Sequence, residues 1–278
     1  MPELPEVETV CRGLQGVLKG RRFAHVDVRR KDLRIPFPKG LAGALTGRQV
    51  ARIYRRAKYV MMDLDDGQVL IVHLGMSGRM TISPQAVSPG KHDHVVFTTD
   101  EGTQITFNDP RRFGLMALAQ QSELDAHKFF RHLGPDALSE SFNAESLSAS
   151  LKGRKTSIKV ALMDQRIVVG VGNIYACESL YRAGISPKRK AGTVAGGRAQ
   201  ALVPVIKEVL RQAIKAGGSS LRDHVQPSGE LGYFQDSWQV YGREGESCGT
   251  CKKKGLGHAV KRIVQGGRST FYCARCQA

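Results

Sequence analysis

The chain has 278 residues, with 42 Lys and Arg against 25 Asp and Glu, and a formal net charge of +17. This length is sufficient for a substantial core and more than one domain. The basic excess favours a polyanionic partner, because each neutralised phosphate releases condensed counterions. No stretch is apolar enough to span a bilayer, and the N-terminus lacks a basic region followed by an apolar one. We therefore expect a soluble, cytoplasmic protein rather than a membrane or secreted one.

The basic residues cluster, most densely between residues 19 and 58. A charge that served only solubility would be scattered over the chain. The clustering therefore favours nucleic acid as the partner.

The first predicted element is an amphipathic helix over residues 6–21, because its apolar positions recur at helical spacing. Pro5 and the acidic residues around it suit the first turn. A small residue at position 2 favours removal of the initiator Met, which would leave the secondary amine of Pro2 at the terminus. Such an amine can hold a carbon as an iminium, with Glu3 passing protons and Glu6 orienting the terminus. From these residues alone, an ordinary helix start is the stronger interpretation.

Short alternating runs follow, separated by Gly-containing turns at residues 66–67 and 101–102: HVDVRR, VARIYRRAKYVMMDLDD, QVLIVHLGM, HDHVVFTTD and TQITFND. This pattern predicts an antiparallel β-sandwich or barrel over residues 23–120. With its leading helix, the first domain is expected at residues 1–131.

The pattern then changes to helical segments with Gly or Ser between them: FNAESLSASLKGR, TSIKVALMDQ, NIYACESLYRAG and GGRAQALVPVIKEVLRQAIKAG. They predict a helical domain at residues 140–226, with a polar, Gly-rich loop at 217–234. The expected fold class is therefore multidomain α+β.

Two CxxC pairs close the chain, Cys248 with Cys251 and Cys273 with Cys276. Four thiolates suit tetrahedral zinc and leave no open position for catalysis, so we expect one structural zinc per chain. The runs VKRIV and RSTFYC predict a hairpin that brings the pairs together in a finger at residues 240–278. Cys11 and Cys177 lie on apolar helical faces and are interpreted as core residues.

Six segments, in order from residue 2 to the last cysteine, resemble bacterial formamidopyrimidine-DNA glycosylases: PELPEVET, RRAKYV, HLGMSGR, NDPRRFG, MDQRIVVGVGNIYACE and GRSTFYCARCQ. The resemblance implies a β-sandwich, a helix–two-turn–helix domain and a zinc finger that enclose damaged double-stranded DNA. It also implies a bifunctional glycosylase and abasic-site lyase of base-excision repair. Such an enzyme removes 8-oxoguanine and formamidopyrimidines and cleaves the strand by β,δ-elimination. Leu4 favours this family over the endonuclease VIII branch, which usually opens with PEGPE.

The same resemblance implies catalytic roles for four residues. Pro2 is the implied nucleophile at the sugar C1′, and Glu3 the acid–base residue. Lys58 matches a lysine that contacts phosphate and assists the chemistry, and Arg268 matches the finger arginine that grips phosphate beside the lesion. On sequence alone, an edge-strand lysine is the stronger interpretation of Lys58.

Further positions match residues that bind DNA: His73, Met76, Arg111, Phe113, Lys155 and Asn173. The resemblance implies that His73 and Asn173 bind phosphate and that Lys155 takes part in lesion recognition. The other three are the implied wedge that fills the stack vacated by a flipped base. The loop at 217–234 is implied to close over that base. From the residues alone, His73 is a core histidine and Asn173 a helix N-cap.

One segment departs from the family pattern, because KKKGLGHAV lengthens the span between the two CxxC pairs. Two alternatives stay open at this point. A non-catalytic zinc-finger protein would explain the charge but leave Pro2 and Glu3 without a role, whereas an endonuclease VIII-like enzyme would remove oxidised pyrimidines. We expect a monomer that works at the bacterial nucleoid.

Overall fold

The computed structural model describes residues 2–219, 227, 229 and 231–278. It divides into two compact units, one formed by Met1–Arg131 and Ile214–Gln235 and the other by His132–Ala213 and Asp236–Ala278. No helix among the described residues is long and apolar enough to cross a membrane. Part of the loop expected at 217–234, namely residues 220–226, 228 and 230, lies outside the described residues.

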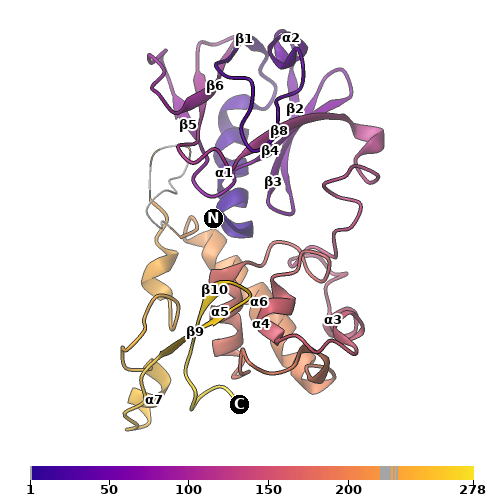
Figure 1. Cartoon of the computed structure of the whole chain (residues 1–278). Helices are drawn as coiled ribbons and strands as arrows, with labels where there is room; N and C mark the ends of the chain where they lie inside the picture. Colours follow the sequence, from indigo (N-terminus) through magenta and orange to yellow (C-terminus); the bar gives the residue numbers. More distant parts are fainter. Residues whose placement is uncertain (1, 220–226, 228, 230) are drawn as a thin grey trace. The chain divides into compact units, whose positions relative to one another are not determined.

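The first unit begins with helix α1 (Leu4–Leu18), close to the predicted range (Figure 1). Its apolar stripe is buried as the periodicity predicted, and Leu14 is fully inaccessible. Glu3 is the N-cap residue and forms a capping box with Glu6, which satisfies two backbone N–H groups at the start of the helix. The capping box therefore fixes the start of the helix. Near its other end, Gln15 Nε2 donates a hydrogen bond of 2.6 Å to Ile53 O, which joins the helix to the β-sandwich.

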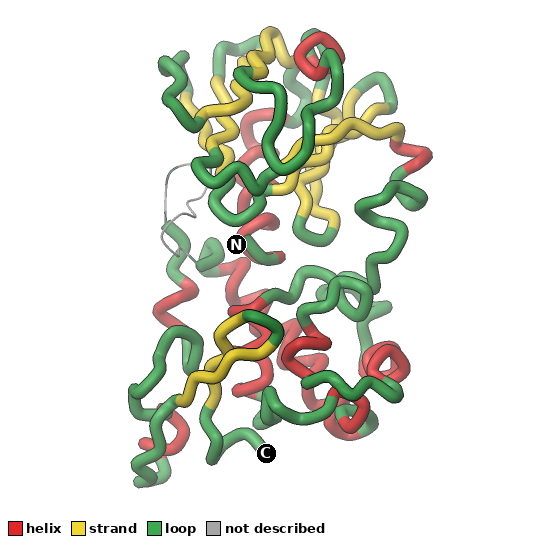
Figure 2. Tube along the Cα trace, viewed as in Figure 1, coloured by secondary structure: helices red, strands yellow, loops and turns green. Residues whose placement is uncertain are grey.

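Two four-stranded antiparallel sheets follow (Figure 2). The first has the order β1 (Phe23–Val28), β6 (Asp93–Thr99), β7 (Gln104–Asn108) and β5 (Arg79–Ser83). The second has the order β2 (Val50–Arg56), β3 (Tyr59–Leu64), β4 (Gln68–His73) and β8 (Leu115–Gln120). Residues from both sheets and α1 share one buried cluster. The predicted sandwich is confirmed.

The structure differs from the prediction in several details. The run at residues 50–66 is a hairpin rather than one strand, and its turn places Ala57 in the left-handed region at φ 54°. Lys58 therefore lies in a turn and is not an edge-strand residue. Strands β5 and β8 and helix α2 (Leu41–Leu45) were not predicted. In β8 the residues Leu, Met and Ala favour strands weakly, and pairing with β4 determines the conformation.

The second unit contains helices α3 (Ala144–Leu151), α4 (Ile158–Leu162) and α5 (Asn173–Arg182), and most of α6 (Gly197–Lys215). Its C-terminal part holds α7 (Gly249–Lys253) and the hairpin of β9 (Lys261–Gln265) and β10 (Arg268–Tyr272). The predicted helices and hairpin are confirmed. Asn173 is the first residue of α5, and Gly172 takes the N-cap position expected for it.

A buried carboxylate joins α5 to the segment that leads into the finger. Glu178 is fully inaccessible, and its Oε1 accepts the N–H groups of Gln239, Val240 and Tyr241 at 2.9–3.1 Å. Leaving a buried charge without such donors costs several kcal/mol, so this segment is held in place. The sequence carried a signal for it, a single Glu among the small and apolar residues of NIYACESLY, but it was not recognised.

Candidate functional site

The N-terminal carboxylates are buried and bonded to the backbone. Glu3 is 3% exposed and Glu6 2% exposed, and Pro2 is also buried. Glu6 Oε2 accepts the Glu3 N–H at 2.9 Å, and Oε1 accepts the Ser219 N–H at 2.8 Å. One carboxylate thus fixes the backbone beside Pro2 and the backbone at residue 219. The bond to Ser219 joins residues 213 apart, and no local pattern in the sequence indicates it.

Lys58 is held near the start of α1 by an arginine on the preceding strand. Arg55 Nε donates to Glu8 Oε2 at 3.1 Å, and Arg55 Nη1 donates to Ala57 O at 3.0 Å. Lys58 itself is only 7% exposed. The next residue, Tyr59, pairs with His73 across β3 and β4, and the two rings lie 4.8 Å apart. The structure therefore brings Lys58 and His73 into one neighbourhood.

His73 is held in one tautomer. Its Nδ1 accepts the Gly75 N–H at 2.9 Å, so the neutral ring carries its proton on Nε2. Burial, followed by the charges of Lys58 and Arg34, lowers the pKa of His73 to about 4. At neutral pH this side chain is an uncharged donor at Nε2.

Met76, Arg111 and Phe113 lie on two adjoining turns. Met76 is 36% and Phe113 43% exposed, and the Arg111 guanidinium lies 5.4 Å from the centre of the Phe113 ring. Gly75 has φ 66°, and a Cβ on it would come within 2.3 Å of the Phe113 carbonyl carbon. Only glycine permits this backbone-to-backbone contact. Two exposed apolar side chains, Met76 and Phe113, and the charged Arg111 therefore lie on adjoining turns.

A buried aspartate holds the second of these turns. Asp109 is fully inaccessible, and its two carboxylate oxygens accept the Ser77 hydroxyl at 2.6 Å and the Gly114 N–H at 2.7 Å. Ser77 Oγ in turn accepts the Arg111 N–H at 3.2 Å. Asp109 and Ser77 were not among the predicted residues, although an Asp before Pro in NDPRRFG is a turn signal.

In the second unit, Asn173 and Arg268 are neighbours and Lys155 stands apart from them. Asn173 Nδ2 donates to Ser269 O at 2.9 Å, and the exposed Arg268 precedes that residue. Lys155 is exposed between α3 and α4, and its side chain makes no hydrogen bond or ion pair with a described residue. Asn173 and Arg268 therefore lie together at the start of α5.

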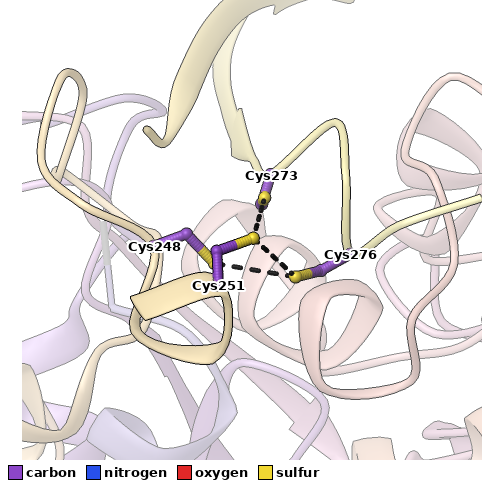
Figure 3. A group of neighbouring side chains, drawn as sticks. All are labelled: Cys248, Cys251, Cys273 and Cys276. Carbon is purple, nitrogen blue, oxygen red and sulfur yellow. Dashed lines mark hydrogen bonds between the residues drawn. The ribbon is translucent and has the colours of Figure 1, made fainter. Parts of the chain in front are cut away.

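The four predicted metal ligands converge (Figure 3). Sulfur separations are 3.7 Å for Cys248 and Cys276, 3.7 Å for Cys251 and Cys273, and 3.4 Å for Cys251 and Cys276. A tetrahedron with Zn–S bonds of 2.3 Å has edges of about 3.8 Å, close to these values. The four thiols therefore fit one structural zinc with no open coordination position.

The fold and the four-thiolate site define the class of protein: it is a multidomain protein with an N-terminal β-sandwich and a structural-zinc finger. Three family profiles match the chain: formamidopyrimidine-DNA glycosylase N-terminal domain at residues 1–116, formamidopyrimidine-DNA glycosylase H2TH domain at 133–225, and zinc finger found in FPG and IleRS at 257–278. A relative from Ruegeria pomeroyi, named formamidopyrimidine-DNA glycosylase, is 55% identical, with both chains fully covered.

Solved structures agree. A Lactococcus lactis Fpg mutant in complex with Fapy-dG-containing DNA has a TM-score of 0.90 and 32% identity, and Lactococcus lactis Fpg with abasic-site DNA has 0.89 and 32%. Each comparison covers 99% of both chains. The chain belongs to the formamidopyrimidine-DNA glycosylase family and is a DNA glycosylase of base-excision repair.

Loss of one thiolate is expected to release the metal. Cys251→Ser opens the tetrahedron, so elemental analysis should fall from one zinc per chain to nearly none. Cys11→Ser is the matched control, because Cys11 is buried in the first unit and is not one of the four ligands. Full zinc in Cys251→Ser would contradict the assignment.

The lowered pKa of His73 predicts a pH dependence of stability. Below pH 6.5 the unfolded chain binds a proton at residue 73, whereas the folded chain binds it only near pH 4. The free energy of unfolding should therefore drop between pH 7 and pH 5, with a contribution from His73 on the order of 1 kcal/mol. His73→Asn keeps an acceptor for the Gly75 N–H and does not titrate. Urea unfolding should show a smaller drop in this variant, and an equal drop would refute the assignment.

Proposed function

We propose that Pro2, freed by removal of Met1, attacks the sugar C1′ of a damaged nucleotide. The new C–N bond forms as the glycosidic bond breaks, and the base leaves with its electron pair and a proton. Protonation of the ring oxygen O4′ and cleavage of the C1′–O4′ bond then open the sugar. The product is an iminium that keeps its positive charge and acts as an electron sink. β- and δ-elimination then break the C–O bonds on the two sides of the sugar. This proposal rests on the Glu6 carboxylate, which holds the backbone N–H next to Pro2.

Glu3 is the acid–base residue of this proposal. Its buried carboxylate directly follows the nucleophile, and an acid–base group must lie within hydrogen-bond reach of the proton it moves. Lys58 supplies positive charge beside the elimination products. Its buried position in the β2–β3 turn limits hydration of the ammonium and strengthens its attraction to phosphate.

Each unit has its own residues that contact the phosphates of the duplex and position it. On the first unit, His73 donates through Nε2 as a neutral group. On the second, Arg268 provides a charged fork and Asn173 lies at the start of α5, where backbone N–H groups favour anions. Lys155 contributes to lesion recognition. Such contacts supply most of the sequence-independent affinity.

Met76, Arg111 and Phe113 form the wedge. Extruding a base leaves a gap in the stack that costs a few kcal/mol, and apolar or planar side chains offset this cost. Support comes from the exposure of the apolar side chains Met76 and Phe113, on turns that a buried aspartate and a close backbone contact hold in place.

The substrates proposed are duplex DNA with 8-oxoguanine or formamidopyrimidine lesions. Support comes from the curated relative's name and from the Fapy-dG complex of the Lactococcus lactis protein.

The enzyme acts as a cytoplasmic monomer at the nucleoid. A three-domain organisation at 1–131, 140–226 and 240–278, with a lesion-recognition loop at 217–234, accompanies this function.

Borohydride reduction with 8-oxoguanine duplex should yield a stable adduct whose linked peptide begins at Pro2, because the iminium is reduced to an amine. Protein that retains Met1, identified by intact mass, should give none. Glu3→Gln should abolish base excision yet bind an abasic analogue nearly as well as the wild type. An adduct on Lys58 or another lysine would refute the assignment to Pro2.

Removal of the wedge should impair extrusion rather than general attraction to DNA. Met76→Ala combined with Phe113→Ala should lower excision of 8-oxoguanine roughly 10- to 100-fold, since a few kcal/mol of unstacking is no longer offset. Affinity for undamaged duplex and cleavage at a preformed abasic site should change little.

Val87→Ala is the matched control, because it removes a 56% exposed apolar side chain from the same unit. It should leave excision unchanged. Equal losses on abasic and 8-oxoguanine duplexes, with a lower melting temperature of the double variant, would show that Met76 and Phe113 stabilise the fold instead.

A further inference from the structure

The finger carries a loop that contributes little to its own core. Residues 252–259, KKKGLGHA, are all exposed, whereas Cys251 and Val260 on either side are buried. The zinc-finger profile begins at residue 257, so the three lysines lie outside the matched range. We name residues 252–259 the lysine loop.

The lysine loop is nevertheless firmly attached at both ends. The Leu256 N–H donates to Cys251 O at 2.9 Å, and the Cys248 N–H donates to His258 O at 2.9 Å. Val260 exchanges backbone hydrogen bonds with Gly245 and Glu246 at 2.9–3.0 Å. Cys248 and Cys251 are metal ligands, so the metal also fixes the base of the loop. A partner would meet a preorganised loop and lose little entropy on binding.

The charge of the lysine loop is not neutralised within the finger. Between residues 241 and 278 the acids are Glu244 and Glu246, and each already pairs with an arginine, at 3.5 Å with Arg262 and 2.9 Å with Arg243. Lys252, Lys253 and Lys254 form no ion pair with any residue that the structure describes. Three consecutive like charges on one exposed loop repel one another, and a polyanion relieves that repulsion.

The lysines lie at the far end of the hairpin from Arg268. In Figure 1, α7 lies at the open end of β9 and β10, opposite the turn that precedes Arg268. Five strand residues span about 17 Å, which corresponds to roughly five base pairs of duplex.

We propose that the lysine loop is a second phosphate-binding element, which binds the duplex backbone at least about five base pairs from the lesion. The proposal rests on the proposed function, in which Arg268 binds phosphate beside the lesion. Three adjacent ammonium groups on a fixed loop suit a row of phosphates, and they contact no base. The loop therefore extends the footprint without changing which lesion is recognised. Lys252 and Lys253 also complement the negative end of α7, but that role would not depend on DNA length.

The test compares a long and a short duplex, each with one abasic analogue at its centre. The long duplex has roughly twelve base pairs on each side of the analogue, and the short duplex has roughly four. The variant is Lys252→Ala, Lys253→Ala and Lys254→Ala together. On the long duplex, the slope of log K against log salt should shrink by about 1 to 3, since each lost phosphate contact contributes about 0.9. On the short duplex, variant and wild type should give the same slope.

The control variant removes the same charge from exposed lysines elsewhere, Lys91→Ala, Lys190→Ala and Lys215→Ala. Its slope should match the wild type on both duplexes, and all proteins should keep one zinc. An equal change on both duplexes, an equal change in the control, or no change on the long duplex would each overturn the proposal. Borohydride trapping at low salt should persist in every variant, so a failure of the Pro2 chemistry is scored separately.

Discussion

Buried carboxylates that bond to distant backbone determine where the site segments lie. Glu6 accepts N–H groups from Glu3 and Ser219, Asp109 accepts the Gly114 N–H and the Ser77 hydroxyl, and Glu178 accepts three N–H groups at residues 239–241. Removing the donors would leave a buried charge unsatisfied, at a cost of several kcal/mol. The segments that supply these donors are therefore held in place. The same arrangement recurs at the N-terminus, at the turns of Met76 and Phe113 and at the entry to the finger, so each unit orders its own segments.

Local periodicity accounted for most of the architecture. The helix over the first residues, the sandwich strands and the C-terminal hairpin follow from patterns that extend over a few residues, where burial on one face is decisive. The hairpin at Ala57 was missed because no glycine or Asn-Gly signal marks its turn, and Ala57 adopts a positive φ instead. Strand β8 was missed because Leu, Met and Ala carry little strand preference of their own and depend on β4 for their conformation.

The metal ligands were predictable for the same local reason, since each CxxC pair lies within one tight turn. The other contacts of the site could not be predicted in this way. Glu6 meets Ser219 only after the chain has folded over more than two hundred residues, and Asp109 is indistinguishable in sequence from a surface turn residue. The tautomer of His73 depends on one backbone N–H two residues later, a detail of turn geometry that composition does not encode. Long-range polar contacts therefore refine the site on a framework that apolar patterning has already built.

The distribution of cysteines has a consequence for an enzyme whose substrates arise under oxidative stress. Peroxide reacts with accessible thiolates. Cys11 is buried and its pKa is raised by that burial, so it presents almost no thiolate, and Cys177 is equally inaccessible. Of the six cysteines, all of them described, Cys276 alone is partly exposed. Oxidants therefore reach the finger before the unit that carries Pro2. Oxidation of Cys276 to a sulfenic acid would remove one of the four thiolates that suit the zinc, so the oxidation state of one C-terminal thiol bears on the integrity of the finger.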